Sequence, residues 1–191
     1  MPDGRGGTVV IGIGNILFRD EGVGIYAAKY LEENYDFSPA VEIVDGGTLG
    51  FKLMGYYQNY DKVIILDTLS IEDTPGSVYN LPSKELMGLG AYRNTAHEVE
   101  VVEMLEICSL LEKMAEVNVI GMVPRDIECV DISLTPEAEA ALPAMVAETV
   151  RELERAGIEA APRRGRSLEE ILRAYNAPTM ERFGTGDSFH R

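Results

Sequence analysis

The chain has 191 residues, of which 46% are hydrophobic and 26% are charged, a composition typical of a globular protein with one full core. Its formal net charge of −15 disfavours nucleic acid as a partner, because residues 1–150 hold 9 Lys and Arg against 25 Asp and Glu. No apolar run reaches the roughly 18 residues of a membrane span, and no signal-peptide pattern opens the chain. We therefore expect a cytoplasmic protein. Its two cysteines, Cys108 and Cys129, are expected to be reduced, buried thiols, because a metal site would need a tighter cluster.

The first thirty residues predict the opening of a βαβ unit. The β-branched run at residues 9–13 is typical of a strand that is buried on both faces. Gly12 and Gly14 permit a sharp turn, and an apolar stripe at helical spacing follows from residue 23 onwards. Glycines at 22 and 24, in the first helical turn, indicate that something packs closely against it.

Two carboxylates, Asp20 and Glu21, stand where this strand ends and the helix begins. One interpretation is helix capping, with Asp20 as the N-cap and Glu21 at the positive end of the helix dipole. The other is functional, since open α/β sheets bind ligands beyond the carboxyl ends of their strands. Capping explains the first acid well and the second only loosely, so both interpretations stay open.

Strand and helix patterns alternate along the rest of the chain. Helices are expected at 49–59, after a capping box at 95–98, and at 136–155, where Pro143 would kink or split the helix. Strands are expected at 41–45, 62–67 and 118–123, with a short edge strand at 77–81 that could be antiparallel and a further short strand at 129–132. This alternation predicts one α/β domain with a mostly parallel sheet and helices on both faces.

The composition changes after residue 160. A basic linker occupies residues 162–166, and residues 167–175 could form two turns of helix before a Gly-rich polar end. We therefore assign residues 1–160 to the α/β domain and residues 161–191 to a linker and tail. Truncation beyond Gly165 is expected to lower the stability of the body by about 1 kcal/mol or less.

Acids stand at the ends of three predicted strands: Asp20 and Glu21 after the first, Asp45 after the second and Asp67 after the third. The carboxyl ends of parallel strands lie along one edge, so these side chains should converge in one crevice. His97 is the only histidine before the tail. It lies in the first turn of a predicted helix, and the start of that helix could lie at the same edge of the sheet. Two carboxylates and one imidazole could bind a borderline divalent metal such as nickel or zinc. Taken singly, each residue also has a structural interpretation: a loop cap, a turn or a backbone hydrogen bond.

Other catalytic motifs are missing from the sequence. Leu17 stands where a dinucleotide fingerprint would place its third glycine after Gly12 and Gly14, and no Walker lysine follows. There is no Gly-x-Ser-x-Gly elbow and no serine or cysteine with an evident base beside it. A hydrolase with this sequence would have to act on water through a metal ion or a carboxylate.

Several segments together form a specific pattern, which runs in order from about Val9 to Leu153: Gly12–Gly24, Asp45–Thr48, Leu66–Asp67, His97–Glu98, Val119–Pro124 and Ser133–Pro136. In this combination the chain resembles the hydrogenase maturation endopeptidases. The tail from about Pro162 has no counterpart in that pattern.

The resemblance implies a phosphorylase/hydrolase-like three-layer αβα sandwich with a mostly parallel, twisted sheet. It also implies an aspartic-type peptidase that removes the C-terminal extension of the large-subunit precursor of a nickel–iron hydrogenase after nickel insertion. By the same resemblance Glu21, Asp67 and His97 bind the metal, and Asp45 is a further acid of the catalytic site. The nickel would be carried by the precursor, and other divalent metals could occupy the same ligands.

Two other classes of protein stay open. A non-catalytic nickel-binding protein that checks hydrogenase assembly would use the same ligands without hydrolysis. A flavodoxin-like nucleotide binder would use the Gly-rich loop instead.

Overall fold

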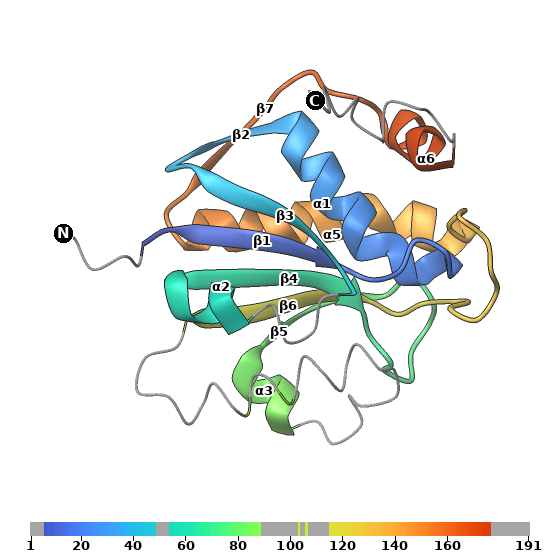
Figure 1. Ribbon diagram of the computed structural model, residues 1–191, viewed down its shortest axis with the longest axis horizontal. Helices are drawn as coiled ribbons and strands as arrows, with labels where there is room; N and C mark the ends of the chain where they lie inside the picture. Colours follow the sequence, from blue (N-terminus) through green and yellow to red (C-terminus); the bar gives the residue numbers. More distant parts are fainter. Residues whose placement is uncertain (1–5, 49–53, 89–102, 104–105, 107–114, 177–191) are drawn as a thin grey trace, which may run out of the picture.

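The computed structural model describes residues 6–48, 54–88, 103, 106 and 115–176. Within this part of the chain, five strands form one sheet in the order β3-β1-β4-β6-β5 (Figure 1). Neighbouring strands run parallel except β5, the predicted edge strand, which is antiparallel to β6. The strands are β1 (Thr8–Ile13), β3 (Val41–Gly47), β4 (Lys62–Thr68), β5 (Val78–Pro82) and β6 (Glu116–Met122).

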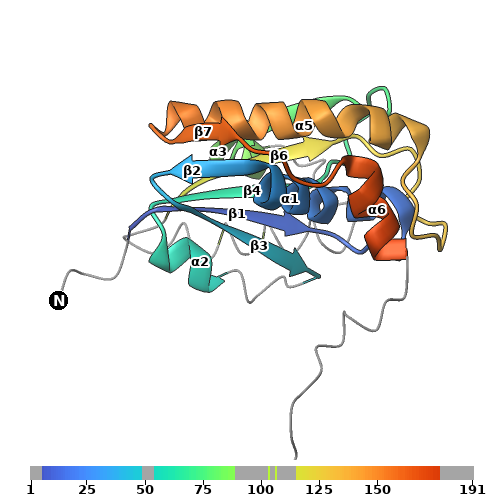
Figure 2. The ribbon, with the colours of Figure 1, turned by 90° about the horizontal axis from the view of Figure 1, so that it is seen from above.

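Helices cover both faces of this sheet, so the predicted three-layer α/β architecture is confirmed (Figure 2). One face packs against α1 (Val23–Asn34) and α5 (Pro136–Arg155), with α6 (Leu168–Asn176) lying on α1, and the other face packs against α2 (Met54–Asn59). A short helix, α3 (Ser83–Gly88), follows β5. Every residue of β1 and β4 is buried, because a strand with helices on both faces needs apolar side chains in both directions. None of the helices in the described ranges is long and apolar enough to cross a membrane.

The last long helix begins and ends where its sequence predicted. Thr135 is the N-cap, and its Oγ1 accepts a hydrogen bond from the Ala138 amide at 3.3 Å, with Pro136 in the first turn. The helix stops before Gly157, which adopts a φ of +79°. Pro143 lies inside the helix and does not split it.

Two expectations for residues 129–132 are wrong. Instead of a strand, this segment makes a single bridge, between Phe18 and Asp131. Its backbone forms local turns, because the carboxylate of Asp126 accepts hydrogen bonds from the amides of Glu128 and Cys129 at 3.0 Å each. Cys129 is exposed and not buried.

A C-terminal arm, residues 159–176, packs against the domain. Its strand β7 (Glu159–Pro162) pairs with β2 (Tyr35–Ser38) in a two-stranded sheet that the sequence analysis did not predict. The guanidinium of Arg166 binds the carboxylate of Glu33 at the end of α1. In α6, Ile171 is fully buried and joins the core cluster of α1 and α5. Because α6 contributes buried side chains to the core, we now expect truncation beyond Gly165 to destabilise the protein more than the sequence alone predicted.

Some of the predicted features lie outside the described residues: the first part of the helix at 49–59, the capping box at 95–98 with His97, and Cys108.

Candidate active site at the carboxyl edge of the sheet

The carboxyl ends of the central strands lie at one level. Gly12 in β1 pairs with Asp45 in β3 on one side and with Leu66 in β4 on the other. The chain leaves β1 towards β3 and later crosses to β4, so the strand order reverses between β1 and β4. Ligands of open α/β sheets bind at such a reversal. The predicted acids after β1, β3 and β4 therefore belong to a single edge of the sheet, here called the carboxyl edge.

Two glycines allow the chain after β1 to press against this edge. A Cβ atom at Gly24 would lie 2.1 Å from the carbonyl oxygen of Leu66, so the start of α1 sits directly on the end of β4. Gly14 has a φ of +138°, and a Cβ there would lie 1.8 Å from the carbonyl oxygen of Glu21. The close packing predicted from these glycines is therefore with the chain itself.

The segment between Gly14 and α1 contains a strained residue. Arg19 has a φ of +46°, a conformation that costs a non-glycine residue about 1 kcal/mol or more. It begins η1 (Arg19–Gly22), the 3-10 helix that carries both neighbouring acids. The guanidinium of Arg19 lies 3.1 Å from the Asp126 carboxylate, and its amide donates to the carbonyl oxygen of Asp131 at 2.8 Å. The segment at 126–131 thus holds Arg19 in this conformation.

Asp20 is fully buried and does not cap α1, so its interpretation as the N-cap is wrong. Its Oδ2 accepts hydrogen bonds from the amides of Arg125 and Asp126 at 2.9 and 3.1 Å and from Oγ1 of Thr135 at 2.8 Å. Its Oδ1 accepts from the amide of Thr135 at 2.8 Å. One carboxylate therefore fastens η1 to the loop after β6 and to the start of α5. No local pattern in the sequence indicates this role, because all the donors lie more than 100 residues away.

Glu21 and Asp67 are the two predicted ligands in the described part of the chain. Glu21 is half-buried on η1, and the Asp67 side chain is buried at the end of β4. The Asp67 Oδ1 accepts a hydrogen bond from the amide of Thr68 at 2.7 Å, which fixes one of its oxygens. Side chains alternate along a strand, so Asp67 belongs to the same face of β4 as Val63 and Ile65, the face covered by α2. The fold thus carries one acid after β1 and one at the end of β4, on either side of the reversal.

The two other predicted site residues, Asp45 and His97, are not placed with Glu21 and Asp67 by the described structure. Asp45 is exposed, and its Oδ1 accepts from the amide of Gly47 at 3.0 Å, as its structural interpretation predicted. His97 lies outside the described residues, so its place in the site stays a prediction. Within the described ranges no three His, Cys, Asp or Glu side chains form a group that could hold a metal ion. The predicted set of Glu21, Asp67 and His97 could not be found among the described residues, because His97 is not one of them.

Further acids at this edge are held in the ionised form. Hydrogen bonds from the amides of Cys129 and Glu128, together with Arg19, lower the pKa of Asp126. Hydrogen bonds from Ser133 lower the pKa of Asp131. The guanidinium of Arg19 forms ion pairs with both carboxylates, at 3.1 Å from Asp126 and 3.9 Å from Asp131.

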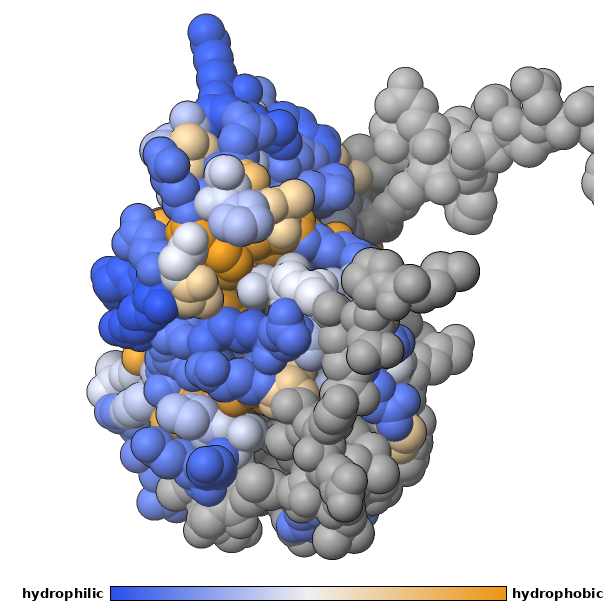
Figure 3. Space-filling model, turned by 90° about the vertical axis from the view of Figure 1, so that its left-hand side faces the viewer, coloured by the Kyte–Doolittle hydropathy of each residue, from blue (hydrophilic) through white to orange (hydrophobic). Residues whose placement is uncertain are grey.

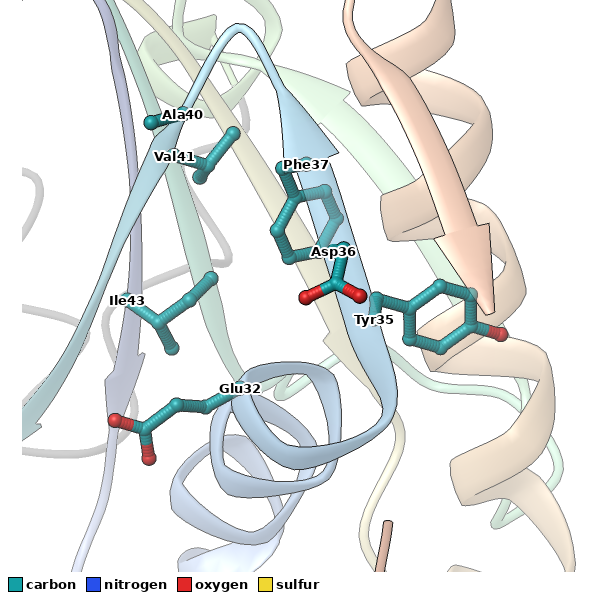
Figure 4. Close-up of a pocket in the computed structure, with 7 residues that line it drawn as sticks. All are labelled: Glu32, Tyr35, Asp36, Phe37, Ala40, Val41 and Ile43. Atoms are coloured by element: carbon teal, nitrogen blue, oxygen red, sulfur yellow. The ribbon is translucent and has the colours of Figure 1, made fainter. Parts of the chain in front are cut away.

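A groove of about 280 Å³ lies elsewhere, between the end of α1, β2 and the start of β3 (Figure 4). It is lined by Glu32, Tyr35, Asp36, Phe37, Ala40, Val41 and Ile43. These residues belong to the end of α1, to β2 and to the chain that leads into β3, at the opposite end of the sheet from Glu21 and Asp67. We therefore assign no part of the predicted chemistry to this groove.

The chain is similar in sequence to known proteins of one family. The family model of the hydrogenase maturation proteases matches residues 25–152, a range that includes Asp45, Asp67 and His97. A hydrogenase 2 maturation protease of Escherichia coli K12 is 32% identical over 157 residues, which are 81% of this chain and 95% of that protein.

Solved structures give the same result. The hydrogenase maturating endopeptidase HybD of E. coli superimposes with a TM-score of 0.76 and 32% identity, covering 82% of this chain and 97% of HybD. The [NiFe] hydrogenase maturation protease HybD of Thermococcus kodakarensis has a TM-score of 0.63 and 25% identity, with 76% and 97% of the two chains covered. By sequence and by fold, this chain belongs to the hydrogenase maturation protease family.

Proposed function

We propose that this protein is an endopeptidase that removes the C-terminal extension of a nickel–iron hydrogenase large-subunit precursor once nickel has been inserted. The observation that carries the proposal is the position of Glu21 and Asp67, in a chain of this family, on the two sides of the strand-order reversal. This is where an open α/β sheet receives a ligand.

In the proposed mechanism the nickel belongs to the substrate. Glu21 and Asp67, with His97, bind the nickel of the precursor and leave some of its coordination positions open, as a catalytic site requires. The precursor binds only when it carries nickel, so the three ligands make processing depend on nickel insertion. The same ligands position the C-terminal extension. The scissile carbonyl is then polarised, or a water activated, by the metal or by a carboxylate.

The fold suits this task because the ligands come from separate, firmly held elements. The carboxylate of Asp20 fastens η1, and one oxygen of Asp67 is fixed by the Thr68 amide. Oriented ligands lose little freedom when the metal arrives, which favours binding to a preformed site.

The test is the intact mass of a large-subunit precursor incubated with this protein. Nickel-loaded precursor should lose the mass of its C-terminal extension, and nickel-free precursor should keep it. An unchanged mass of the loaded precursor, with the protein bound to it, would support the non-catalytic assembly-checking alternative. Equal cleavage of both precursors would contradict recognition through nickel.

A further inference from the structure

The strained residue at the start of η1 stands directly before the two acids. Among the described residues, Arg19 is the only one besides glycines with a positive φ, at +46°. In this conformation the Cβ atom of an L-residue crowds the following carbonyl oxygen. Such strain persists only where the surrounding structure holds it, and it is concentrated at functional sites. The contacts of Arg19 therefore decide the direction in which η1 leaves the preceding loop.

The carboxylate of Asp126 connects Arg19 to the loop after β6. Its Oδ1 accepts hydrogen bonds from the amides of Glu128 and Cys129 at 3.0 Å each, which fix the side chain within its own loop. Its Oδ2 accepts a hydrogen bond from Nη1 of Arg19 at 3.1 Å. One oxygen therefore orients the carboxylate, and the other binds the guanidinium through a charge-assisted hydrogen bond.

The backbone of the same loop binds the chain on both sides of the strained dihedral angles. The amide of Arg19 donates to the carbonyl oxygen of Asp131 at 2.8 Å, and the amide of Asp20 donates to that of Asp126 at 3.2 Å. In return, the amide of Asp126 donates to Oδ2 of Asp20 at 3.1 Å. Asp126 thus contacts both Arg19 and Asp20.

The position of Glu21 depends on the conformation of Arg19, because both belong to one short 3-10 helix. The amide of Glu21 donates to the carbonyl oxygen of Phe18 at 3.1 Å, which closes a turn around Arg19. The carbonyl oxygen of Glu21 lies so close to Gly14 that a Cβ atom there would be 1.8 Å away. A change of Arg19 to a negative φ would redirect η1 and move Glu21 away from this contact.

We propose that Asp126 is a positioning residue of the processing site. By holding Arg19 in its left-handed conformation, it places the carboxylate of Glu21 at the carboxyl edge of the sheet. The proposal rests on the proposed function, in which Glu21 binds the nickel of the precursor. Asp126 acts through Arg19 and not on the metal, as residues that orient a metal ligand do.

The test compares Asp126→Asn in two backgrounds, wild type and Arg19→Gly, with nickel-loaded precursor. Asparagine can still accept the loop amides at Oδ1 but cannot form the ion pair with Arg19. In the wild-type background kcat/KM should fall about ten- to a hundredfold. Glycine adopts a positive φ without strain, so the same substitution should leave kcat/KM unchanged in the Arg19→Gly background. Equal slowing in both backgrounds, or wild-type processing by Asp126→Asn, would overturn the proposal.

Two further variants separate this role from a change of charge and from a loss of folding. Glu128→Gln removes the same charge from an exposed side chain of the same loop and should process precursor like the wild type. Arg19→Ala loses the guanidinium and keeps the steric penalty, so it should melt at a lower temperature and process precursor roughly tenfold more slowly than Arg19→Gly. Equal melting and processing of these two Arg19 variants would contradict the role of the left-handed conformation.

The wild-type protein distinguishes failure of this proposal from failure of the proposed function. A wild type that leaves nickel-loaded precursor uncut would refute the proposed function. A wild type that cuts the precursor, together with an equally fast Asp126→Asn variant, would refute the positioning role alone.

Discussion

The two ends of the sheet stabilise buried charges in opposite ways. At the amino edge, where β4 and β6 begin, the ammonium group of buried Lys62 lies 2.6 Å from Glu152 and 2.8 Å from Glu116. The second oxygen of Glu152 accepts from Arg155 at 2.8 Å and from Asn80 at 2.9 Å. The surface at this end is mostly hydrophilic, with a smaller apolar area (Figure 3). At the carboxyl edge, by contrast, the four donors that bind the buried carboxylate of Asp20 are neutral amide and hydroxyl groups.

This difference distinguishes charges that only stabilise the fold, at the amino edge, from charges that can bind a ligand, at the carboxyl edge. An ion pair such as Lys62 with Glu152 cancels charge and leaves nothing for a ligand. Neutral donors stabilise the carboxylate of Asp20 without cancelling its negative charge, whereas Asp126 and Asp131 at the same edge share the guanidinium of Arg19. We expect the uncancelled charge to favour a metal cation nearby. We therefore expect substitutions at the amino edge to change stability alone, and substitutions at the carboxyl edge to change processing.

The largest effect on stability should come from removing α6, which braces the carboxyl edge from outside. Tyr175 packs edge-on against Tyr26 with ring centroids 5.1 Å apart, and the Tyr26 hydroxyl donates to the carbonyl of Ile132 at 3.0 Å. A chain ending at Gly165 should lose about 4 kcal/mol, because buried Ile171 and Leu172 are removed as well. The melting temperature should fall by roughly 10 °C. The control is a chain ending at Asn176, which keeps the contacts described for α6. Equal melting temperatures of the two truncated chains would show that α6 does not stabilise the protein.

Breaking the ion pair at the amino edge should have the next largest effect. Glu152→Ala leaves the buried ammonium of Lys62 without its closest carboxylate, which should cost about 3 kcal/mol in the free energy of unfolding. Processing below the melting temperature should be unchanged. Arg151→Ala removes an exposed partner of Glu148 on the same helix and should cost about 1 kcal/mol or less. Slower processing by Glu152→Ala at full folding would show that the two edges are not independent.

The smallest effect is a pH dependence at the amino edge. Burial opposes ionisation of Glu152, but hydrogen bonds from Lys62, Arg155 and Asn80 outweigh it and lower the pKa of this carboxyl group. A lowered pKa in the folded state stabilises the protein above the unfolded pKa of about 4.3, and this stability is lost as the pH falls through the folded pKa. The difference in melting temperature between wild type and Glu152→Gln should therefore be constant above about pH 5 and shrink below about pH 4. A difference in melting temperature that grows as the pH falls would show that folding raises the pKa of Glu152, contrary to this prediction.

Local patterns predicted the elements that are buried or capped by their own residues. The β-branched runs of β1 and β4 and the cap at Thr135 act within a few residues, so the sequence displays them directly. The acids after β1 and β4 could be placed on one edge because parallel strands share the direction of their carboxyl ends.

Contacts between distant residues could not be predicted in this way. The role of Asp20 depends on amides at 125, 126 and 135, which no spacing in the sequence connects to it. The pairing of β2 with β7 and the burial of Ile171 likewise depend on how the arm runs across α1. The arm also lies beyond the part of the chain that resembles the family.

The neighbouring acids Asp20 and Glu21 test the central claim most directly, because the account gives them different tasks on one short helix. The measurement is the rate of precursor processing, with thermal melting, for Glu21→Gln and Asp20→Asn, and with Glu154→Gln on the exposed side of α5 as control. Replacing a residue that only orients a metal ligand costs 10–100-fold, so Glu21→Gln should slow processing about a hundredfold or more with an unchanged melting temperature. Asp20→Asn should lose about 2 kcal/mol of stability, because its amide nitrogen would face backbone donors. Near wild-type processing by Glu21→Gln would contradict the account.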